Sequence, residues 1–318
     1  MVAPEDTIAE IGRIYGMKRV VGLVWSGTDD PPTKGKLLAD ARRFVVRLYA
    51  LDSESEARYH TEMIARLEDA GLRAESVVPT VDSAAYARIH ALGFVTVHPK
   101  YAEIAMPQPC MPEDAAAWGA FVAAMHVTCE LWRPSCAVPV SSMRDPPADL
   151  LGEATELATV DVRSLEVIKR FSDVIVGTCE RLRKAEATQP VHGDLWPGNL
   201  LKSAQGLRAI DFREAGNGSR AVDMATAFRW LPWEENRQKA ELLWRAWLSG
   251  YRREREPSEA ELASVASLAC LQHLWWLVQE ARAASAGAKG YAQSAWYVRD
   301  HCQAIERLLR PTGGEHAR

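Results

Sequence analysis

Residues 191–223 read VHGDLWPGNLLKSAQGLRAIDFREAGNGSRAVD. Three polar residues stand out by their spacing: Asp194 and Asn199 are separated by four residues, and Asp211 follows after two short apolar runs, LL and LRAI. The small polar segment SAQG lies between these runs, and this pattern is typical of a β-hairpin. Because a hairpin folds back on itself, we expect Asn199 and Asp211 to lie side by side.

Asn199 and Asp211 carry the kind of side-chain oxygen that binds a divalent cation. Mg²⁺ is usually held by one or two carboxylates together with the phosphates of a substrate. A carboxylate and an amide at one end of a hairpin therefore predict a Mg²⁺ site. The alternative interpretation is that His192-Gly193-Asp194 is only a turn in which Asp194 caps a helix.

This stretch resembles the aminoglycoside phosphotransferase / choline kinase-like superfamily, whose members have a protein-kinase-like fold. The usual pattern of that family is H-G-D-L-x-x-G-N, then I-D-F/W, then G-x-x-x-x-D. Here the pattern is carried by HGDLWPGNLL at 192–201, by IDF at 210–212 and by the segment 216–223. The gap between Asp194 and Asn199 also matches the protein-kinase catalytic loop, H-R-D-x-x-x-x-N.

The resemblance implies a role for each of these residues. Asp194 orients or deprotonates the hydroxyl of the phosphoryl acceptor, while Asn199 and Asp211 hold Mg²⁺. Asp223 braces the catalytic loop from below, and ATP is the implied phosphoryl donor. Arg213 stands where the protein-kinase motif D-F-G has Gly, which argues against a protein-kinase-type flip of the loop and leaves Mg²⁺ binding unaffected.

The remainder of the chain predicts the two lobes of an α+β, protein-kinase-like fold. An N-terminal nucleotide-binding lobe, residues 1–98, is expected to hold an antiparallel sheet of about five strands. A C-terminal catalytic and acceptor-binding lobe, residues 99–318, is expected to be mainly helical. Strand-like runs occur at 19–25, 43–49, 84–89 and 93–98, and helical periodicity marks 4–16, 54–70, 113–126 and 160–187.

Two residues of the N-terminal lobe are candidates for binding the nucleotide. Protein kinases place a Lys on the third strand to pair with the α- and β-phosphates. Members of the resembled family often read V-L-R there, so Arg47 is the candidate phosphate contact, the alternative being an exposed charge on a strand. The family pairs this cation with a helical Glu; its spacing leads to His60 here, so Glu56, one turn earlier on the same face, is the candidate. Residues 26–36 are expected to form a long turn near the phosphates.

Composition narrows the class of partner. The chain of 318 residues has a net charge of −4, which gives no support for a nucleic-acid partner and mildly favours a cationic small substrate. No run of 18 or more apolar residues and no signal peptide are visible, so no membrane partner and a cytoplasmic location are expected. The six cysteines form no C-x-x-C pair and are expected to be free thiols of a reducing cytosol.

The acceptor is the open question, because acceptor specificity lies in the helical lobe, where motifs are absent. An amino-sugar or aminoglycoside-like hydroxyl is expected, and choline, ethanolamine or homoserine also fit the shared motifs. Seven of the eleven tryptophans lie after Asp223 and form either helical core or an aromatic wall facing a cationic or sugar substrate. Glu234, Glu235 and Glu280 either face an amine or are solvated charges.

Two alternatives are less favoured than a small-molecule kinase that uses ATP and Mg²⁺. A catalytically inactive nucleotide-binding pseudokinase would usually have lost one of Asp194, Asn199 or Asp211, and all three are present. A protein kinase would carry a G-x-G-x-x-G loop, an A-P-E motif and an activation segment, which are missing from the sequence. The predicted function is therefore transfer of the γ-phosphoryl group of ATP to a hydroxyl of a small molecule.

Overall fold

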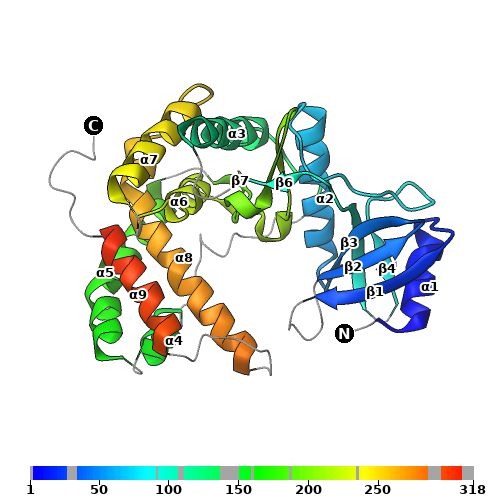
Figure 1. The fold of residues 1–318 in the computed structure, drawn as a ribbon, viewed down its shortest axis with the longest axis horizontal. Coiled ribbons are helices and arrows are strands. Elements are labelled where there is room, and N and C mark those ends of the chain that lie inside the picture. Colours follow the sequence, from blue (N-terminus) through cyan, green and yellow to red (C-terminus); the bar gives the residue numbers. More distant parts are fainter. Residues whose placement is uncertain are drawn as a thin grey trace.

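The computed structural model of the chain describes residues 3–26, 34–90, 92–106, 111–136, 150–158, 161–185, 188–233, 236–285 and 295–309. These residues form two lobes side by side (Figure 1): a smaller lobe built on a sheet and a larger lobe built mostly from helices. The expectation of a two-lobe α+β fold with an antiparallel sheet in the first lobe is confirmed.

The sheet of the N-terminal lobe has five antiparallel strands in the order β1-β2-β3-β5-β4. One of its faces packs on helix α1 (Glu5–Ile14), where Ile11 is fully buried in a cluster with Leu23 and Val46. The predicted number of strands is confirmed. The strands are β1 (Val20–Ser26), β2 (Lys34–Ala39), β3 (Arg42–Tyr49), β4 (Ala87–Ile89) and β5 (Gly93–Pro99).

Strand β2 differs from the prediction, which places Lys34 in a long turn. The segment KGKLLA contains no β-branched residue, so its own propensity for a strand is low. It becomes a strand because it pairs with β1 on one side and β3 on the other, and every second side chain is buried. The rest of the expected phosphate-covering turn, residues 27–33, lies outside the described residues.

Helix α2 (Glu54–Asp69) lies between the sheet and the helical lobe (Figure 1). Its predicted apolar stripe is confirmed, because Tyr59, Met63, Ile64 and Leu67 are all buried. These side chains belong to the large cluster that forms the core of the C-terminal lobe rather than to the cluster under the sheet. Helix α2 therefore fixes the N-terminal lobe against the helical lobe and positions the strands that face the cavity between them.

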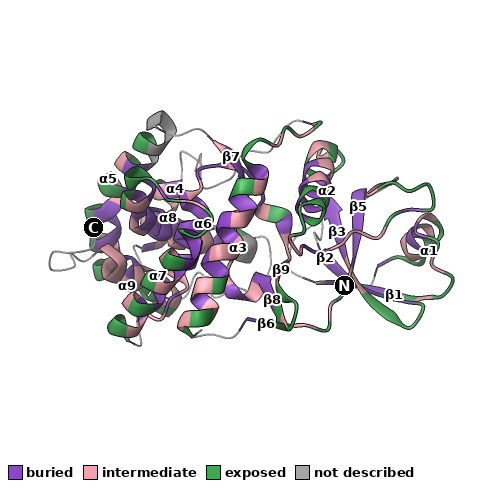
Figure 2. Cartoon of the chain, turned by 90° about the horizontal axis from the view of Figure 1, so that it is seen from above, coloured by how far each residue is buried: buried purple, intermediate pink, exposed green. Residues whose placement is uncertain are grey.

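The C-terminal lobe packs its helices around two apolar clusters, and Figure 2 shows buried residues on the inward faces of its central helices. Helices α3 and α7 cross closely, with Trp118 and Trp247 edge to face in the core. The helices are α3 (Pro112–Glu130), α4 (Leu150–Ala158), α5 (Val162–Ala185), α6 (Ala221–Arg229), α7 (Arg237–Tyr251), α8 (Glu259–Ser285) and α9 (Ala295–Leu309).

Short strands and turns carry the loops of the C-terminal lobe. The predicted hairpin is confirmed: β8 (Leu200–Ser203) pairs with β9 (Gly206–Ala209), and β6 (Ile104–Ala105) adds a third strand. A second pair joins β7 (Gln189–Val191) to β10 (Gly216–Gly218). Two single 3₁₀ turns, η1 (Pro197–Asn199) and η2 (Phe212–Glu214), lie beside them.

One described helix is long and apolar enough to cross a membrane, the segment Glu259–Arg282 of α8. Two thirds of its most apolar window, 67%, is buried inside the molecule, against α5, α6 and α9. Helix α8 therefore has the burial of a core helix.

Candidate active site

The loop that carries Asp194 is held from below by a buried carboxylate. Asp223, near the start of α6, accepts the backbone N–H groups of His192 at 2.9 Å and Gly193 at 2.8 Å. The ring of His126 lies 3.1 Å from the same carboxylate and contacts the Tyr251 hydroxyl on its other side. Charge-assisted bonds of this kind are strong in a buried setting, so Asp223 fixes the loop as the resemblance implied.

Gly193 is required by the shape of this loop. Its φ of +82° is in the left-handed region that residues with a Cβ rarely adopt. A Cβ there would lie 2.3 Å from the carbonyl oxygen of Glu214. The close approach brings η2, and with it Asp211, next to the loop that carries Asp194.

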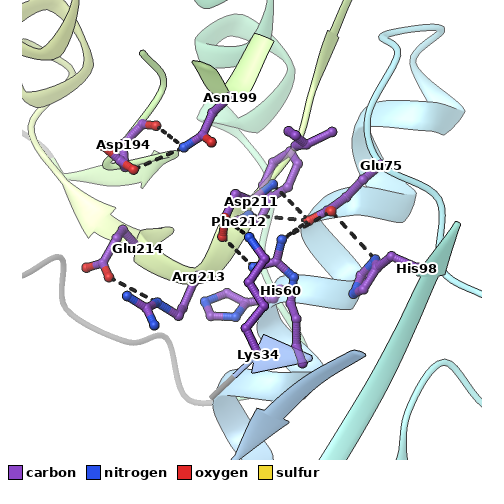
Figure 3. Close-up of polar contacts among 12 residues, drawn as sticks. Lys34, His60, Glu75, His98, Asp194, Asn199, Asp211, Phe212, Arg213 and Glu214 are labelled. Atoms are coloured by element: carbon purple, nitrogen blue, oxygen red, sulfur yellow. Dashed lines mark hydrogen bonds and ion pairs between the residues drawn. The ribbon is translucent and has the colours of Figure 1, made fainter. Parts of the chain in front are cut away.

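Asp194 and Asn199 are bound to one another across the loop (Figure 3). The Asn199 Nδ2 group donates to the carboxylate of Asp194 at 3.0 Å and to its carbonyl oxygen at 2.8 Å. Burial raises the pKa of Asp194 to about 7, and the positive charge of Arg229 opposes this rise. A carboxyl group with such a pKa is suited to accept a proton near neutral pH.

Asp211 ends the hairpin with its carboxylate between two cations (Figure 3). Lys34 Nζ donates to it at 2.8 Å, and Arg47 donates to its other oxygen. Burial alone would raise the pKa of this carboxyl, but the charges of Arg47 and Lys34 outweigh it and hold the pKa of Asp211 well below its usual range. Asp211 is therefore ionised near neutral pH.

The partner of Arg47 is Glu75, and the expected pairing with Glu56 is wrong. Arg47 is buried, so the alternative of an exposed strand charge is also wrong, and its Nη2 group lies 3.1 and 3.2 Å from the two oxygens of Glu75. Glu56 is exposed and lies near Asp52 and Glu214, so Glu56 makes no clamp.

The helix cannot supply the clamp because its inward position is taken by His60. The ring of His60 contacts the hydroxyl of Tyr49 and the carbonyl oxygen of Ala215. The carboxylate comes instead from the loop after α2, where Glu75 also accepts the backbone N–H of Asp211 at 3.1 Å. No motif marks Glu75 in the sequence.

One cavity of about 570 Å³ lies between the lobes. It brings together Asp194, Asn199, Asp211 and Arg47, as expected, and adds Lys34, which sequence reasoning missed because it lies in the unrecognised strand β2. Glu56 is not among the lining residues.

The donor set on this side of the cavity fits Mg²⁺. The Asn199 amide oxygen accepts no hydrogen bond from the described residues, and it shares the cavity with the ionised carboxylate of Asp211. One carboxylate and one neutral oxygen, completed by phosphate oxygens, are the ligands that Mg²⁺ prefers.

The other side of the cavity is aromatic and is formed by the helical lobe. Trp196 and Trp230 stack with ring centroids 4.4 Å apart, and Trp276 lines the same wall. Other tryptophans, such as the fully buried Trp247, belong to the core, so the tryptophans divide between the core and the wall of the cavity. Glu280 lines the cavity, whereas Glu234 and Glu235 lie outside the described residues.

Comparison with known proteins places the chain in a family. The sequence model of the family described as "Phosphotransferase enzyme family" matches residues 31–257. The chain belongs to this family. An uncharacterized protein of Deinococcus radiodurans is 24% identical to this phosphotransferase-family chain over 310 residues, covering 91% of this chain and 85% of that protein.

Two solved structures show the same fold. An amicoumacin kinase in complex with AMP-PNP, Ca²⁺ and Ami has a TM-score of 0.75 and 16% identity, and the match covers 99% of this chain and 96% of that one. A microcompartment-associated aminopropanol kinase has a TM-score of 0.71 and 18% identity, with 96% and 98% covered. The expected kinase-like fold and the resemblance to the phosphotransferase superfamily are therefore confirmed.

Proposed function

We propose that this chain is a cytoplasmic phosphotransferase that uses ATP and Mg²⁺ to phosphorylate a hydroxyl of an amine-bearing small molecule, with an amino sugar or aminoglycoside-like acceptor as the first candidate. One observation carries the proposal. Asp194, Asn199 and Asp211 line a single cavity together with the two cations Arg47 and Lys34. Phosphoryl transfer depends mainly on positioning and on charge neutralisation, and these residues supply both.

The N-terminal side of the cavity binds the nucleotide in this proposal. Arg47 and Lys34 contact the phosphates, and Glu75 keeps Arg47 in place with a two-oxygen contact. Asn199 and Asp211 hold Mg²⁺. An ion held by these two residues would supply positive charge beside the phosphates and offset the charge that develops during transfer.

Asp194 acts on the acceptor. Its carboxylate is fixed by Asn199 and orients the acceptor hydroxyl in line with the γ-phosphorus. The acceptor oxygen forms a bond to phosphorus, the bond from phosphorus to the β–γ bridging oxygen breaks, the hydroxyl proton passes to Asp194, and ADP leaves. Because burial raises the pKa of Asp194 to about 7, its proton affinity is suited to this task.

An amino-alcohol acceptor of the choline, ethanolamine or homoserine type is the second candidate. The fold similarity to an aminopropanol kinase and the presence of Glu280 beside Trp230 and Trp276 favour it. An aromatic wall with one carboxylate suits an ammonium group of any of these acceptors. A pseudokinase is disfavoured, because each of Asp194, Asn199 and Asp211 keeps the position that chemistry requires.

The test is ADP release by the purified protein with Mg·ATP across amino sugars, aminoglycosides and amino alcohols. Asp194→Asn should lower turnover by roughly 10²-fold or more while Mg·ATP affinity stays nearly intact. Asp211→Asn should lose Mg²⁺ binding and turnover together. If Asp194→Asn keeps near-full activity on an acceptor that the native protein phosphorylates, the assignment of the base is wrong.

A further inference from the structure

Arg229 is a half-buried cation in the lining of the cavity, and it has no ion-pair partner among the described residues. It ends α6, and its Nε atom is shielded from solvent with no hydrogen-bond acceptor among the described residues. No carboxylate in the described part of the chain lies within ion-pair distance of it, and its nearest interaction is with the ring of Trp230 at 5.1 Å. Burial lowers the pKa of Arg229 to about 10, although Asp194 opposes this effect from a distance.

Such an arrangement is costly unless a ligand completes it. A charge that is even partly removed from water is normally paired, because the loss of its hydration is unfavourable. His301, which also lines the cavity, brings no negative charge, and burial together with Arg229 lowers its pKa to about 4. The guanidinium is therefore a positive group in the cavity lining whose Nε donor has no acceptor among the described residues.

Glu280 presents the opposite charge in the same cavity. It forms no ion pair with any described residue, Arg229 included, although both line the space around Trp230 and Tyr297. The charges of Glu280 and Arg229 both act on Tyr297, since Glu280 raises and Arg229 lowers the pKa of its hydroxyl. Two opposite charges that share a cavity and remain apart leave room for a molecule that carries both complementary charges.

We propose that the acceptor is zwitterionic: a hydroxylated amino acid whose carboxylate binds Arg229 and whose ammonium group faces Glu280, while Asp194 receives the hydroxyl. This inference rests on the proposed phosphotransferase function and narrows its acceptor to the amino-acid members of the second candidate class, of which homoserine is one. A guanidinium binds a carboxylate through two parallel N–H donors, which gives orientation as well as affinity. The aromatic wall of Trp196 and Trp230 encloses the carbon chain between these groups.

An alternative role for Arg229 would give a different experimental result. If its only task were to tune Asp194 by its charge, Arg229→Met would shift the pH profile of all acceptors upward and equally. A ligand-binding role predicts a loss confined to acceptors that carry a carboxylate.

The experiment compares hydroxylated amino acids with the same molecules lacking the carboxylate, for example homoserine with 3-aminopropanol and serine with ethanolamine. For the native chain we expect kcat/KM to be about tenfold or more higher for the carboxylate-bearing member, the size of a charged hydrogen-bonded contact. Arg229→Met should abolish this preference. Arg252→Met, which removes an exposed arginine paired with Glu256, is the matched control and should retain it.

Stability supplies a second readout that does not require turnover. Without acceptor, Arg229→Met should melt at the same temperature as the native chain or higher, because an unpaired, half-buried charge is replaced by an apolar chain of similar length. Lower stability of this variant, equal use of both members of each pair, or no use of any hydroxylated amino acid would overturn the inference. Turnover of carboxylate-free acceptors alone would leave the proposed function standing, whereas no turnover together with no stabilisation by Mg·ATP would remove the proposed function itself.

Discussion

Asp194 and Asp211 are carboxylates of one cavity whose pKa values shift in opposite directions. Burial raises the pKa of Asp194 to about 7, since its one cationic neighbour, Arg229, acts only from a distance. Asp211 is also buried, but Arg47 and Lys34 contact it directly and hold its pKa well below the usual range. Groups whose pKa values are pushed apart in this way can divide proton transfer and cation binding between them.

The pKa of Asp194 predicts a rising pH profile. A proton acceptor must be ionised, so kcat/KM should increase with pH up to about pH 7, where Asp194 ionises, and then level off. A kcat/KM profile on any phosphorylated acceptor, measured at constant ionic strength and saturating Mg·ATP, would test this. A profile that is flat between pH 5 and pH 8 would contradict the assignment of Asp194.

The same shift has a consequence for stability. An Asp whose pKa is raised by folding keeps its proton between the unfolded value of about 3.9 and the folded value near 7, so the native chain loses stability as pH rises through this window. Asp194→Asn removes this loss. Its melting temperature should therefore exceed that of the native chain increasingly from pH 4 to pH 7, and a constant difference across this range would count against the raised pKa.

Glu75, which contacts Arg47, and Glu56, which does not, give a matched pair of variants. Glu75→Ala should destabilise the chain by about 3 kcal/mol, because it leaves the buried Arg47 with one carboxylate partner fewer. It should also weaken Mg·ATP binding. Glu56→Ala, on the exposed face of α2, should change stability by less than about 0.5 kcal/mol and leave Mg·ATP affinity unchanged. Denaturant unfolding measures the stability of each variant, and nucleotide titration measures its affinity for Mg·ATP. Equal effects of the two substitutions would support Glu56 as a partner of Arg47.

At the scale of elements, the sequence predicted the features that depend on local patterns, and it did not predict those that depend on tertiary pairing. The hairpin that ends at Asp211 and the apolar stripe of α2 follow from residues close in sequence, and both are confirmed. Strand β2 exists only because β1 and β3 flank it, so its composition gave no signal and Lys34 was missed. Glu75 was missed for a related reason: a loop residue meets Arg47 through the packing of α2, which no local spacing encodes.

Gly193 and Gly206 both have a positive φ, but a Cβ would clash with a neighbouring segment only at Gly193. Gly193 in the loop that carries Asp194 and Gly206 in the β8–β9 hairpin have φ of +82° and +102°. A Cβ would lie 2.3 Å from a carbonyl oxygen at Gly193 and would meet nothing within 4 Å at Gly206. Gly206→Ala should cost about 1 kcal/mol and keep activity, since only the backbone is strained. Gly193→Ala should cost more and lower turnover strongly, because the loop must move away from η2; melting curves and ADP release compare the two.

At the scale of the whole molecule, the cavity is bridged by ion pairs between the lobes. Lys34 and Arg47 come from the sheet, and Asp211 comes from the hairpin of the helical lobe. In the proposed reaction the same three residues receive phosphates and Mg²⁺. Nucleotide binding therefore replaces contacts between the lobes by contacts through the ligand, and the stability of the molecule should depend on both components of Mg·ATP.

Thermal melting with ATP and Mg²⁺ added separately and together tests this dependence. Mg·ATP at 100 times its dissociation constant should stabilise the native chain by about 2.7 kcal/mol, since a ligand that binds only the folded state shifts the equilibrium by that amount. Asp211→Asn should respond to ATP equally with and without Mg²⁺, because the carboxylate that holds the ion is lost while Arg47 and Lys34 remain. Asp194→Asn, which leaves all three residues in place, should respond as the native chain does. A native melting temperature unchanged by saturating Mg·ATP would contradict nucleotide binding, and a full Mg²⁺ response in Asp211→Asn would move the metal site away from the hairpin.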